Sequence, residues 1–205
     1  MGIYQDRILP RIQDMAMSRK SGREVRARVC AGGHGDVVEI GFGTGLNAPY
    51  YPPEVTMILA IEPSAVCLRI AEPRIARSTV AVVPAGLNGE QLDIPSEKCD
   101  AALSTWTLCT IPDLTAALTE VRRVLKPGGA LHFVEHGHAP DPKVERWQRR
   151  FEPLNKRLAG GCHLTRHIPA LIEEAGFAVE KLDTYYFKSD PKPLGYTFEG
   201  RAVKR

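Results

Sequence analysis

The sequence predicts an α/β fold of the Rossmann-like kind, with a seven-stranded, mostly parallel sheet, helices on both faces and a C-terminal antiparallel hairpin. Short runs rich in Val, Ile, Leu and Ala alternate with helical stretches from residue 37 onward. This alternation is typical of a doubly wound parallel sheet, whose strands are covered on both faces. The first run ends in a glycine-rich loop, as in nucleotide-binding sheets. Two aromatic-containing runs precede the C-terminus, and these predict the hairpin.

Each strand is expected where a short apolar run stands between turn signals. The expected strands are Val37–Ile40, Thr56–Ile61, Thr79–Val83, Ala101–Ser104, Ala130–Glu135, Val179–Tyr186 and Tyr196–Val203. The helical stretches between them lie near 44–50, 64–76 and 113–125.

The helix at 113–125 has the clearest signals. Asp113 is a good N-cap, and Lys126-Pro127-Gly128-Gly129 ends the helix. Its apolar stripe consists of Leu114, Leu118, Val121 and Leu125.

The N-terminal segment carries apolar side chains at a helical spacing: Tyr4, Ile8, Ile12 and Met15. Pro10 interrupts the pattern, so one helix or two short ones are expected. The basic residues that follow are expected to form a solvated helix face; they are Arg19, Lys20, Arg23, Arg26 and Arg28. We interpret residues 1–32 as a helical cap on a single domain that spans 1–205.

Composition restricts the function classes. The chain has 205 residues, 43% of them hydrophobic and 25% charged, which fits one folded domain. A net charge of +3 is too small to indicate nucleic acid as a partner. The five cysteines are scattered without CxxC spacing, so neither a zinc site nor a disulfide framework is expected, and we interpret them as buried packing residues. With no apolar run of membrane-spanning length and no signal peptide, the cytoplasm is the expected location.

The most informative segment is the loop Gly41-Phe42-Gly43-Thr44-Gly45, which follows a buried strand. Glycines allow tight turns and close approach of a ligand to the backbone. The pattern is GxGxG, whereas the dinucleotide fingerprint is GxGxxG. Glu39 also precedes the loop, and its carboxylate would repel a pyrophosphate but favour the sulfonium and ammonium of S-adenosylmethionine (SAM). A glycine-rich turn with no ligand is the alternative.

Two later segments extend the expected donor site. Glu62 ends the second strand, where its carboxylate can accept hydrogen bonds from both ribose hydroxyls; an exposed acid without a ligand is the alternative. In Gly86-Leu87-Asn88, Leu87 can cover the adenine and Asn88 can meet its exocyclic amine. An ordinary turn explains this last segment equally well.

Together these residues resemble the class I SAM-dependent methyltransferases over nearly the whole chain. The segments that carry the resemblance are EIGFGTGLN, IEPS, CDAALSTW and VRRVLKPGGALHFVEH. Within that superfamily the chain resembles a subgroup that contains alkyl thiol methyltransferases and bacterial phospholipid N-methyltransferases, through TLCTIPD, FVEHG, GCHLTR, the Trp147–Pro153 helix and GYTFEGRAVKR. The resemblance implies three departures from the subgroup: the chain is expected to have no counterpart of the hydrophobic N-terminal anchor of the mammalian enzymes, Asn88 replaces an acid, and Phe42 replaces a Cys.

The residues and the resemblance together predict SAM as cofactor and S-adenosyl-L-homocysteine as product. The donor site is expected to comprise Glu39, Gly41, Phe42, Gly43, Thr44, Gly45, Asn47, Glu62, Pro63, Leu87, Asn88, Thr105 and Trp106.

His136 is the candidate general base. It follows the fifth strand on the carboxyl side of the sheet, and neutral imidazole is available near pH 7. A packing role is the alternative. His138 is a second candidate for the base, whereas His163 is interpreted as a helix-entry residue with Thr165 as N-cap for Arg166–Ala175. Cys109 and Cys162 are interpreted as packing residues because the reaction needs no covalent intermediate.

Residues 139–163 are the expected acceptor lid. Apolar side chains recur there at helical spacing, at Val144, Trp147, Phe151, Leu154 and Leu158. The other side is basic and carries Lys143, Arg146, Arg149, Arg150, Lys156 and Arg157. A helix that covers the sheet edge with a solvated basic back is one interpretation. The other is a flap that closes an apolar pocket and contacts anionic membrane peripherally.

These features predict methyl transfer to a small, lipophilic acceptor, with a thiol or a phenol or quinol favoured. The alternative within enzymes is a phospholipid amine N-methyltransferase acting on phosphatidylethanolamine. An alternative of a different class is a non-catalytic SAM-binding protein, and a nicotinamide-dependent oxidoreductase is the third alternative.

Overall fold

The structure is a computed structural model that describes residues 4, 8–188 and 190–205. Its seven strands form one sheet in the order β3-β2-β1-β4-β5-β7-β6. The strands are β1 (Gly35–Ile40), β2 (Val55–Ile61), β3 (Ala81–Gly86), β4 (Cys99–Thr105), β5 (Leu125–His136), β6 (Phe177–Tyr186) and β7 (Tyr196–Lys204). The first five pair in parallel, and β5, β7 and β6 pair antiparallel. The predicted fold class is confirmed, including the hairpin.

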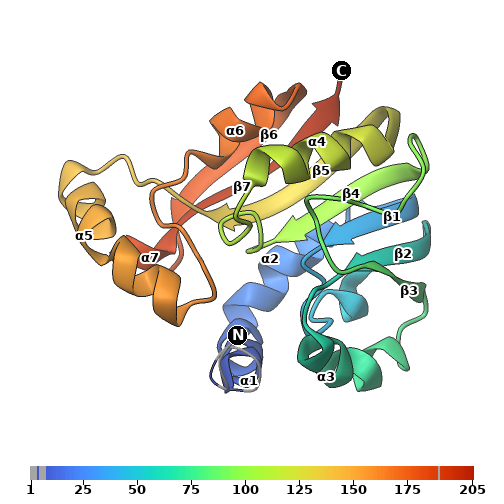
Figure 1. Cartoon of the computed structure of the whole chain (residues 1–205), viewed down its shortest axis with the longest axis horizontal. Coiled ribbons are helices and arrows are strands. Elements are labelled where there is room, and N and C mark those ends of the chain that lie inside the picture. Colours follow the sequence, from blue (N-terminus) through green and yellow to red (C-terminus); the bar gives the residue numbers. More distant parts are fainter. Residues whose placement is uncertain (1–3, 5–7, 189) are drawn as a thin grey trace.

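Helices cover both faces of this sheet (Figure 1). They are α1 (Leu9–Met17), α2 (Lys20–Cys30), the 3-10 helix η2 (Ala48–Tyr50), α3 (Ala65–Ile75), α4 (Leu114–Val124), α5 (Pro142–Leu158), α6 (Ile168–Glu174) and α7 (Lys192–Gly195). One core joins α4 and α6 to strand residues such as Val38 and Phe133. A second core joins α2 and α3 to the opposite face, through residues such as Val37 and Val134. Consecutive residues therefore face different cores, as the two-residue period of a strand requires.

The carboxyl ends of β1, β2, β4 and β5 meet at one edge of the sheet because these strands are parallel. The segments that follow them are thereby brought together although they lie far apart in sequence. In open α/β sheets this edge is where ligands bind.

The limits of several expected elements differ from the structure. The fifth strand begins at Leu125 rather than Ala130, so it includes Lys126-Pro127-Gly128-Gly129. The third strand begins at Ala81 rather than Thr79, because the Ser78 hydroxyl bonds both the N–H and the carbonyl of Val80 and holds a bend there. Only Ala48–Tyr50 of the stretch 44–50 is helical, since Gly43 and Gly45 have left-handed backbones. The helix expected at 166–175 spans Ile168–Glu174 instead.

Thr165 is not the N-cap of that helix. His167 occupies the N-cap position, and the Thr165 hydroxyl donates to Glu152 at 2.5 Å. The helix at 113–125 is confirmed: it spans Leu114–Val124, and Asp113 accepts a hydrogen bond from the Ala116 N–H at 2.9 Å.

The N-terminal cap expected at 1–32 consists of two helices, although residues 1–3 and 5–7 lie outside the described part of the chain. The break falls at Ser18 and Arg19, not at Pro10, which lies in the first turn of α1 where proline is tolerated. One expected feature is wrong. Arg26 does not belong to a solvated face but is buried on the side of α2 that carries Val25 and Val29.

None of the helices described here is both long and apolar enough to cross a membrane.

Candidate active site

The glycine loop leaves β1 in a conformation that requires its glycines. Gly41 and Gly43 have φ values of +70° and +59°. A Cβ on Gly41 would collide with the Thr107 side chain at 2.1 Å, whereas a Cβ on Gly43 would meet no atom closer than 3.7 Å. At Gly41 the loop is therefore packed against the segment that follows β4, whereas at Gly43 it is open. An open, glycine-lined turn at a strand end is a cradle for a ligand.

Glu62 lies directly beside this turn. Its carboxylate accepts hydrogen bonds from the Gly43 N–H and the Ser64 N–H, each at 2.8 Å. Burial raises the pKa of Glu62, and the two N–H donors only partly offset that effect. Each carboxylate oxygen can accept more than one hydrogen bond, so Glu62 retains capacity for a ligand.

Glu39 lies deeper, beneath the loop. It is 1% exposed, and its two oxygens accept hydrogen bonds from Asn47 Nδ2 at 2.9 Å and from the Tyr51 hydroxyl at 2.5 Å. Burial raises the pKa of Glu39 to about 7, although Tyr51, Asn47 and the nearby Arg26 all favour the ionised form. Because Glu39 is almost fully buried beneath the loop, its role is to orient Asn47 and Tyr51.

Arg26 completes this network and was missed as a site residue. Its Nη1 donates to Asn47 Oδ1 at 2.8 Å and to Thr105 Oγ1 at 2.9 Å, while its guanidinium lies 4.9 Å from the centre of the Trp106 ring. The signal was present in the sequence, because Arg26 falls on the same helical face as Val25 and Val29.

Several buried polar atoms at this edge have no hydrogen-bond partner among the described residues. They include Arg26 Nε, Trp106 Nε1 and His136 Nδ1. Unpaired polar groups are costly when buried, so a cluster of them indicates a place where a ligand or water supplies the missing bonds. Trp106 also has a left-handed backbone, with φ +53°, which is uncommon for a bulky residue and typical of functional sites.

Glu135, at the end of β5, holds the segment after β4 in place. Its buried carboxylate accepts hydrogen bonds from the Ser104 hydroxyl and the Thr107 N–H at 2.9 Å, and from the Cys109 N–H at 3.3 Å. The same reasoning that singled out Glu62, an acid at the carboxyl end of a parallel strand, could have identified this residue.

Helix α1 lies against the glycine loop. Asp14 accepts a hydrogen bond from the Thr44 hydroxyl at 2.6 Å and forms an ion pair with Arg74 at 2.7 Å, and Arg74 also donates to the Thr44 carbonyl. Burial alone would raise the pKa of Asp14, but the bonds from Arg74 and Thr44 outweigh it and lower the pKa. The N-terminal cap is thus joined to the loop by a defined set of contacts.

The remaining predicted donor residues lie at the rim or under the loop. Pro63, Leu87 and Asn88 are exposed, and Asn88 Oδ1 accepts a hydrogen bond from the Glu90 N–H in a local turn. Phe42 is buried in the core beneath the loop, so its ring is a packing element.

His136 lies beside a small cavity of about 30 Å³, which we call the Trp106 cavity. The cavity is lined by Ala16, Met17, Arg19, Ser21, Gly22, Trp106, His136, Phe187 and Asp190. Burial lowers the pKa of His136 to about 4, with Asp190 acting weakly in the opposite direction. The imidazole is therefore neutral at physiological pH and a weak proton acceptor. Its assignment as general base remains a prediction that this environment disfavours.

The predicted lid, residues 139–163, contributes no side chain to the Trp106 cavity. His138 stacks on His167 and lies 3.4 Å from Glu145, and His163 lies 3.3 Å from Glu152, so neither lines the cavity. All five cysteines are buried, as expected, and Cys109 and Cys162 place their Sγ atoms 3.5 Å apart. The lid function itself remains a prediction.

Comparisons with known proteins agree with this geometry. Residues 38–133 match a family described as a methyltransferase domain. The chain is 34% identical over 174 residues to a thiol S-methyltransferase, TMT1B, of Rattus norvegicus, covering 82% of this chain and 70% of the relative. It is 29% identical over 141 residues to a phosphatidylethanolamine N-methyltransferase of Cereibacter sphaeroides, covering 66% of this chain and 68% of that protein.

A solved SAM-dependent methyltransferase from Thermotoga maritima shares the fold, with a TM-score of 0.66, 23% identity and coverage of 99% of this chain and 98% of that one. The same family is indicated by the glycine loop, by the acids at the strand ends and by these relatives. The chain belongs to the class I SAM-dependent methyltransferases, and SAM is its methyl donor.

Proposed function

We propose that this enzyme transfers a methyl group to the sulfur of a small, apolar thiol. The observation that carries the proposal is the Trp106 cavity, which brings the apolar surfaces of Trp106, Phe187 and Met17 to the carboxyl edge of the sheet. Thiol S-methyltransferases are among the relatives that the chain resembles over most of its length.

The donor-binding roles follow from the contacts. Glu62 would accept hydrogen bonds from the ribose hydroxyls, and the open turn at Gly43 would leave room for the adenosyl group. The unpaired Nε of Arg26 fits a carboxylate, which the amino-acid end of SAM carries. Bound SAM supplies an electrophilic methyl group on a sulfonium, and its leaving group needs no proton.

The protein's main task is then alignment. Holding the acceptor in line with the methyl group can remove roughly 7–11 kcal/mol from the barrier in favourable cases. Trp106 would form one wall of that site, because its left-handed backbone directs the side chain and the Arg26 guanidinium packs on its ring. The cavity is smaller than a ligand pocket, so entry of an acceptor requires Phe187 or the α1–α2 connection to move.

The proton of the thiol needs no strong base. A thiol near neutral pH is ionised to the extent of a few per cent and is then highly nucleophilic. Neutral His136 can accept a hydrogen bond from an incoming S–H at Nδ1, which is buried and unpaired in the described structure. We expect it to orient the acceptor rather than to remove its proton.

The test is a pH profile for a series of alkyl and aryl thiols of different acidity, with labelled SAM and a parallel phenol series. In the plot of kcat/KM against pH, the pH at which the slope changes should follow the pKa of each thiol. A break that stays at one pH for all thiols would indicate an enzyme base, and label in phenols alone would contradict sulfur transfer.

A second candidate function is N-methylation of phosphatidylethanolamine. The relative from Cereibacter sphaeroides and the basic, apolar surface of α5 favour it. Incubation of the enzyme with labelled SAM, a soluble thiol and phosphatidylethanolamine vesicles separates the two, since label in the lipid fraction alone would replace the thiol proposal.

A further inference from the structure

Helix α5 is attached to the protein by polar side chains. Gln148 is buried and bonds the Ala139 N–H and the carbonyls of Gly137 and Pro193, at 2.9 to 3.1 Å. One turn further, Glu152 accepts hydrogen bonds from the Leu164 and Thr165 N–H groups. Asn155 then donates to the Cys162 carbonyl at 2.8 Å. The spacing of these three residues defines the face of α5 that lies against the domain.

The apolar stripe of the same helix faces outward. Trp147, Phe151, Leu154 and Leu158 are 41–52% exposed, and only Val144 of the predicted stripe is buried. The Trp147 and Phe151 rings stack on each other with their centres 5.1 Å apart. This corrects the expectation that the stripe covers the sheet edge: the helix has its polar face inside and its large apolar side chains in contact with solvent.

Exposed apolar side chains also occur on the N-terminal segment. The Tyr4 hydroxyl donates to the Leu158 carbonyl at 2.9 Å, which joins that segment to the end of α5. Ile8, Ile12 and Met15 follow at helical spacing and are 45–72% exposed. Eight of the twelve large exposed apolar residues identified in the described chain lie on the N-terminal segment and α5. We call this set the α1–α5 face: Tyr4, Ile8, Ile12, Met15, Trp147, Phe151, Leu154 and Leu158.

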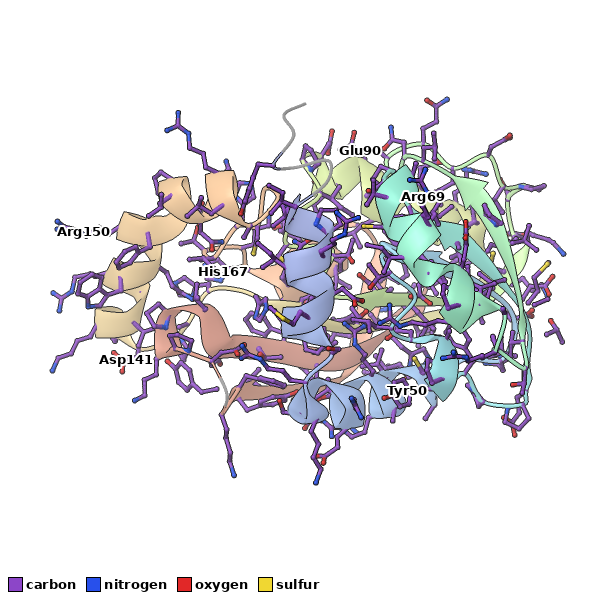
Figure 2. All side chains as sticks on the ribbon, turned by 90° about the horizontal axis from the view of Figure 1, so that it is seen from below. Tyr50, Arg69, Glu90, Asp141, Arg150 and His167 are labelled. Atoms are coloured by element: carbon purple, nitrogen blue, oxygen red, sulfur yellow. The ribbon has the colours of Figure 1, made fainter. Side chains whose placement is uncertain are left out.

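Positive charge flanks this face. Six basic side chains of α5 are exposed: Lys143, Arg146, Arg149, Arg150, Lys156 and Arg157. Among the described residues only Arg149 of the six forms an ion pair, with Glu145. Figure 2 shows Arg150 at the outer side of α5, and Arg69 on α3, away from α5. Five of the six basic side chains of α5 therefore have no ion-pair partner among the described residues.

We propose that the α1–α5 face binds an anionic lipid surface. An amphipathic helix with large aromatic and aliphatic side chains beside a row of Lys and Arg is the usual form of a helix that lies in a membrane interface. The stripe would enter the acyl boundary, and the long basic side chains would reach phosphate headgroups. A symmetric contact between two copies would bring the same unpaired charges together, so charge complementarity favours the lipid.

The inference does not depend on the identity of the acceptor. Co-sedimentation of the full chain with phosphatidylcholine vesicles, with and without phosphatidylglycerol, measures it directly. We expect binding to the anionic vesicles, and we expect it to weaken as salt rises, because surface charge is screened. Equal or absent binding to both vesicle types would overturn the proposal.

Two sets of variants locate the surface. The triple substitution Trp147→Ser, Phe151→Ser, Leu154→Ser should lower the partition coefficient roughly tenfold or more. Its matched control is Val83→Ser, Leu182→Ser, which alters two residues of similar exposure, 42% and 40%, on other elements and should leave partitioning unchanged.

The double substitution Arg146→Glu, Arg150→Glu should reduce binding by about fivefold for each positive charge removed, because a basic residue near an anionic surface contributes about 1 kcal/mol. Its control is Arg69→Glu, Arg77→Glu. Thermal unfolding and methylation of a soluble acceptor verify that each variant is folded and active. Normal vesicle binding by both α5 variants would contradict the proposal. It would also be contradicted if the wild-type protein bound no vesicles and instead formed a dimer that the serine variant disrupts.

Discussion

The carboxyl edge of the sheet and helix α5 use polar and apolar side chains in opposite ways. At the edge, Glu39, Glu62 and Glu135 are buried and each is hydrogen-bonded to nearby groups. In α5, polar side chains also attach the helix to the domain, but the large apolar ones lie in solvent. In α5, hydrogen-bond partners rather than the apolar pattern therefore determine which face of the helix is buried. The buried acids lie at the donor site, and the exposed rings of α5 belong to the surface that we propose binds lipid.

The largest expected effect concerns the donor edge. Replacing Glu62 with Ala removes the acceptor for Gly43 and Ser64 and for the ribose hydroxyls, so affinity for S-adenosylhomocysteine should fall about 100-fold or more, given 1.5–3 kcal/mol for each charge-assisted bond. Isothermal titration calorimetry measures it. The exposed acid Glu54 provides the control, and an unchanged affinity in folded Glu62→Ala would remove Glu62 from the donor site.

The next prediction concerns the free energy of unfolding, to which the ionisation of Glu39 makes a contribution of similar size. The pKa of its carboxyl rises from 4.5 to about 7 on folding, so the folded state binds the proton more tightly. Its contribution to stability is complete below 4.5, is lost as the pH rises to about 7 and is constant above, an overall change of about 3 kcal/mol.

Glu39→Gln removes this titration. Urea unfolding of the variant and the wild type, below and above that pH window, should therefore show the variant gaining relative stability as the pH rises. A difference that does not change with pH would mean that Glu39 ionises as freely as an exposed acid.

A smaller effect is expected at His136. A general base contributes about 10²–10⁴-fold to the rate, whereas an orienting imidazole that is already neutral should contribute roughly tenfold or less. We expect His136→Asn to lower kcat modestly and to leave the shape of the pH profile unchanged, since the pKa of His136 is about 4. Stopped assays with a soluble thiol measure both quantities. If His136→Asn removed a titration step from the pH profile and also lowered kcat strongly, His136 would be the general base.

The smallest effect concerns the contact of α1 with the loop. Asp14→Ala removes a partly exposed ion pair and the bond from Thr44, and should cost about 1 kcal/mol, or roughly 2–4 °C in Tm. Asp183→Ala, which alters a more exposed ion pair with Lys181, should change Tm less. A double-mutant cycle with Arg74→Ala checks that the loss belongs to this pair, and additive effects would show that it does not.

The same contrast explains what could be predicted from the sequence. The strand positions and the fold class could be predicted because parallel strands have a distinctive apolar composition and the glycine loop marks the end of the first strand. Asp113 and Ser64 act as helix caps within one turn, so the limits of α4 and α3 were predictable to within a residue or two.

The errors occurred where side chains contact residues far away in the sequence. The helical face that Arg26 shares with Val25 and Val29 indicates its burial, but its partners, Asn47 and Thr105, are 21 and 79 residues away and cannot be identified from the sequence. Helix α5 was assigned an inward apolar face because periodicity identifies a stripe but not its direction. That direction is set by Gln148, whose partners lie at Gly137 and Pro193. Thr165 was assigned as a cap because Glu152, which binds it, lies on a different element.

A crystal structure of the complex with S-adenosylhomocysteine tests both regions in one measurement. The account predicts ribose hydroxyls within hydrogen-bond distance of Glu62, the sulfur directed toward Trp106 and His136, and α5 with Trp147 and Phe151 still facing outward. A ligand bound away from Glu62, or an α5 stripe folded over the acceptor side, would contradict it.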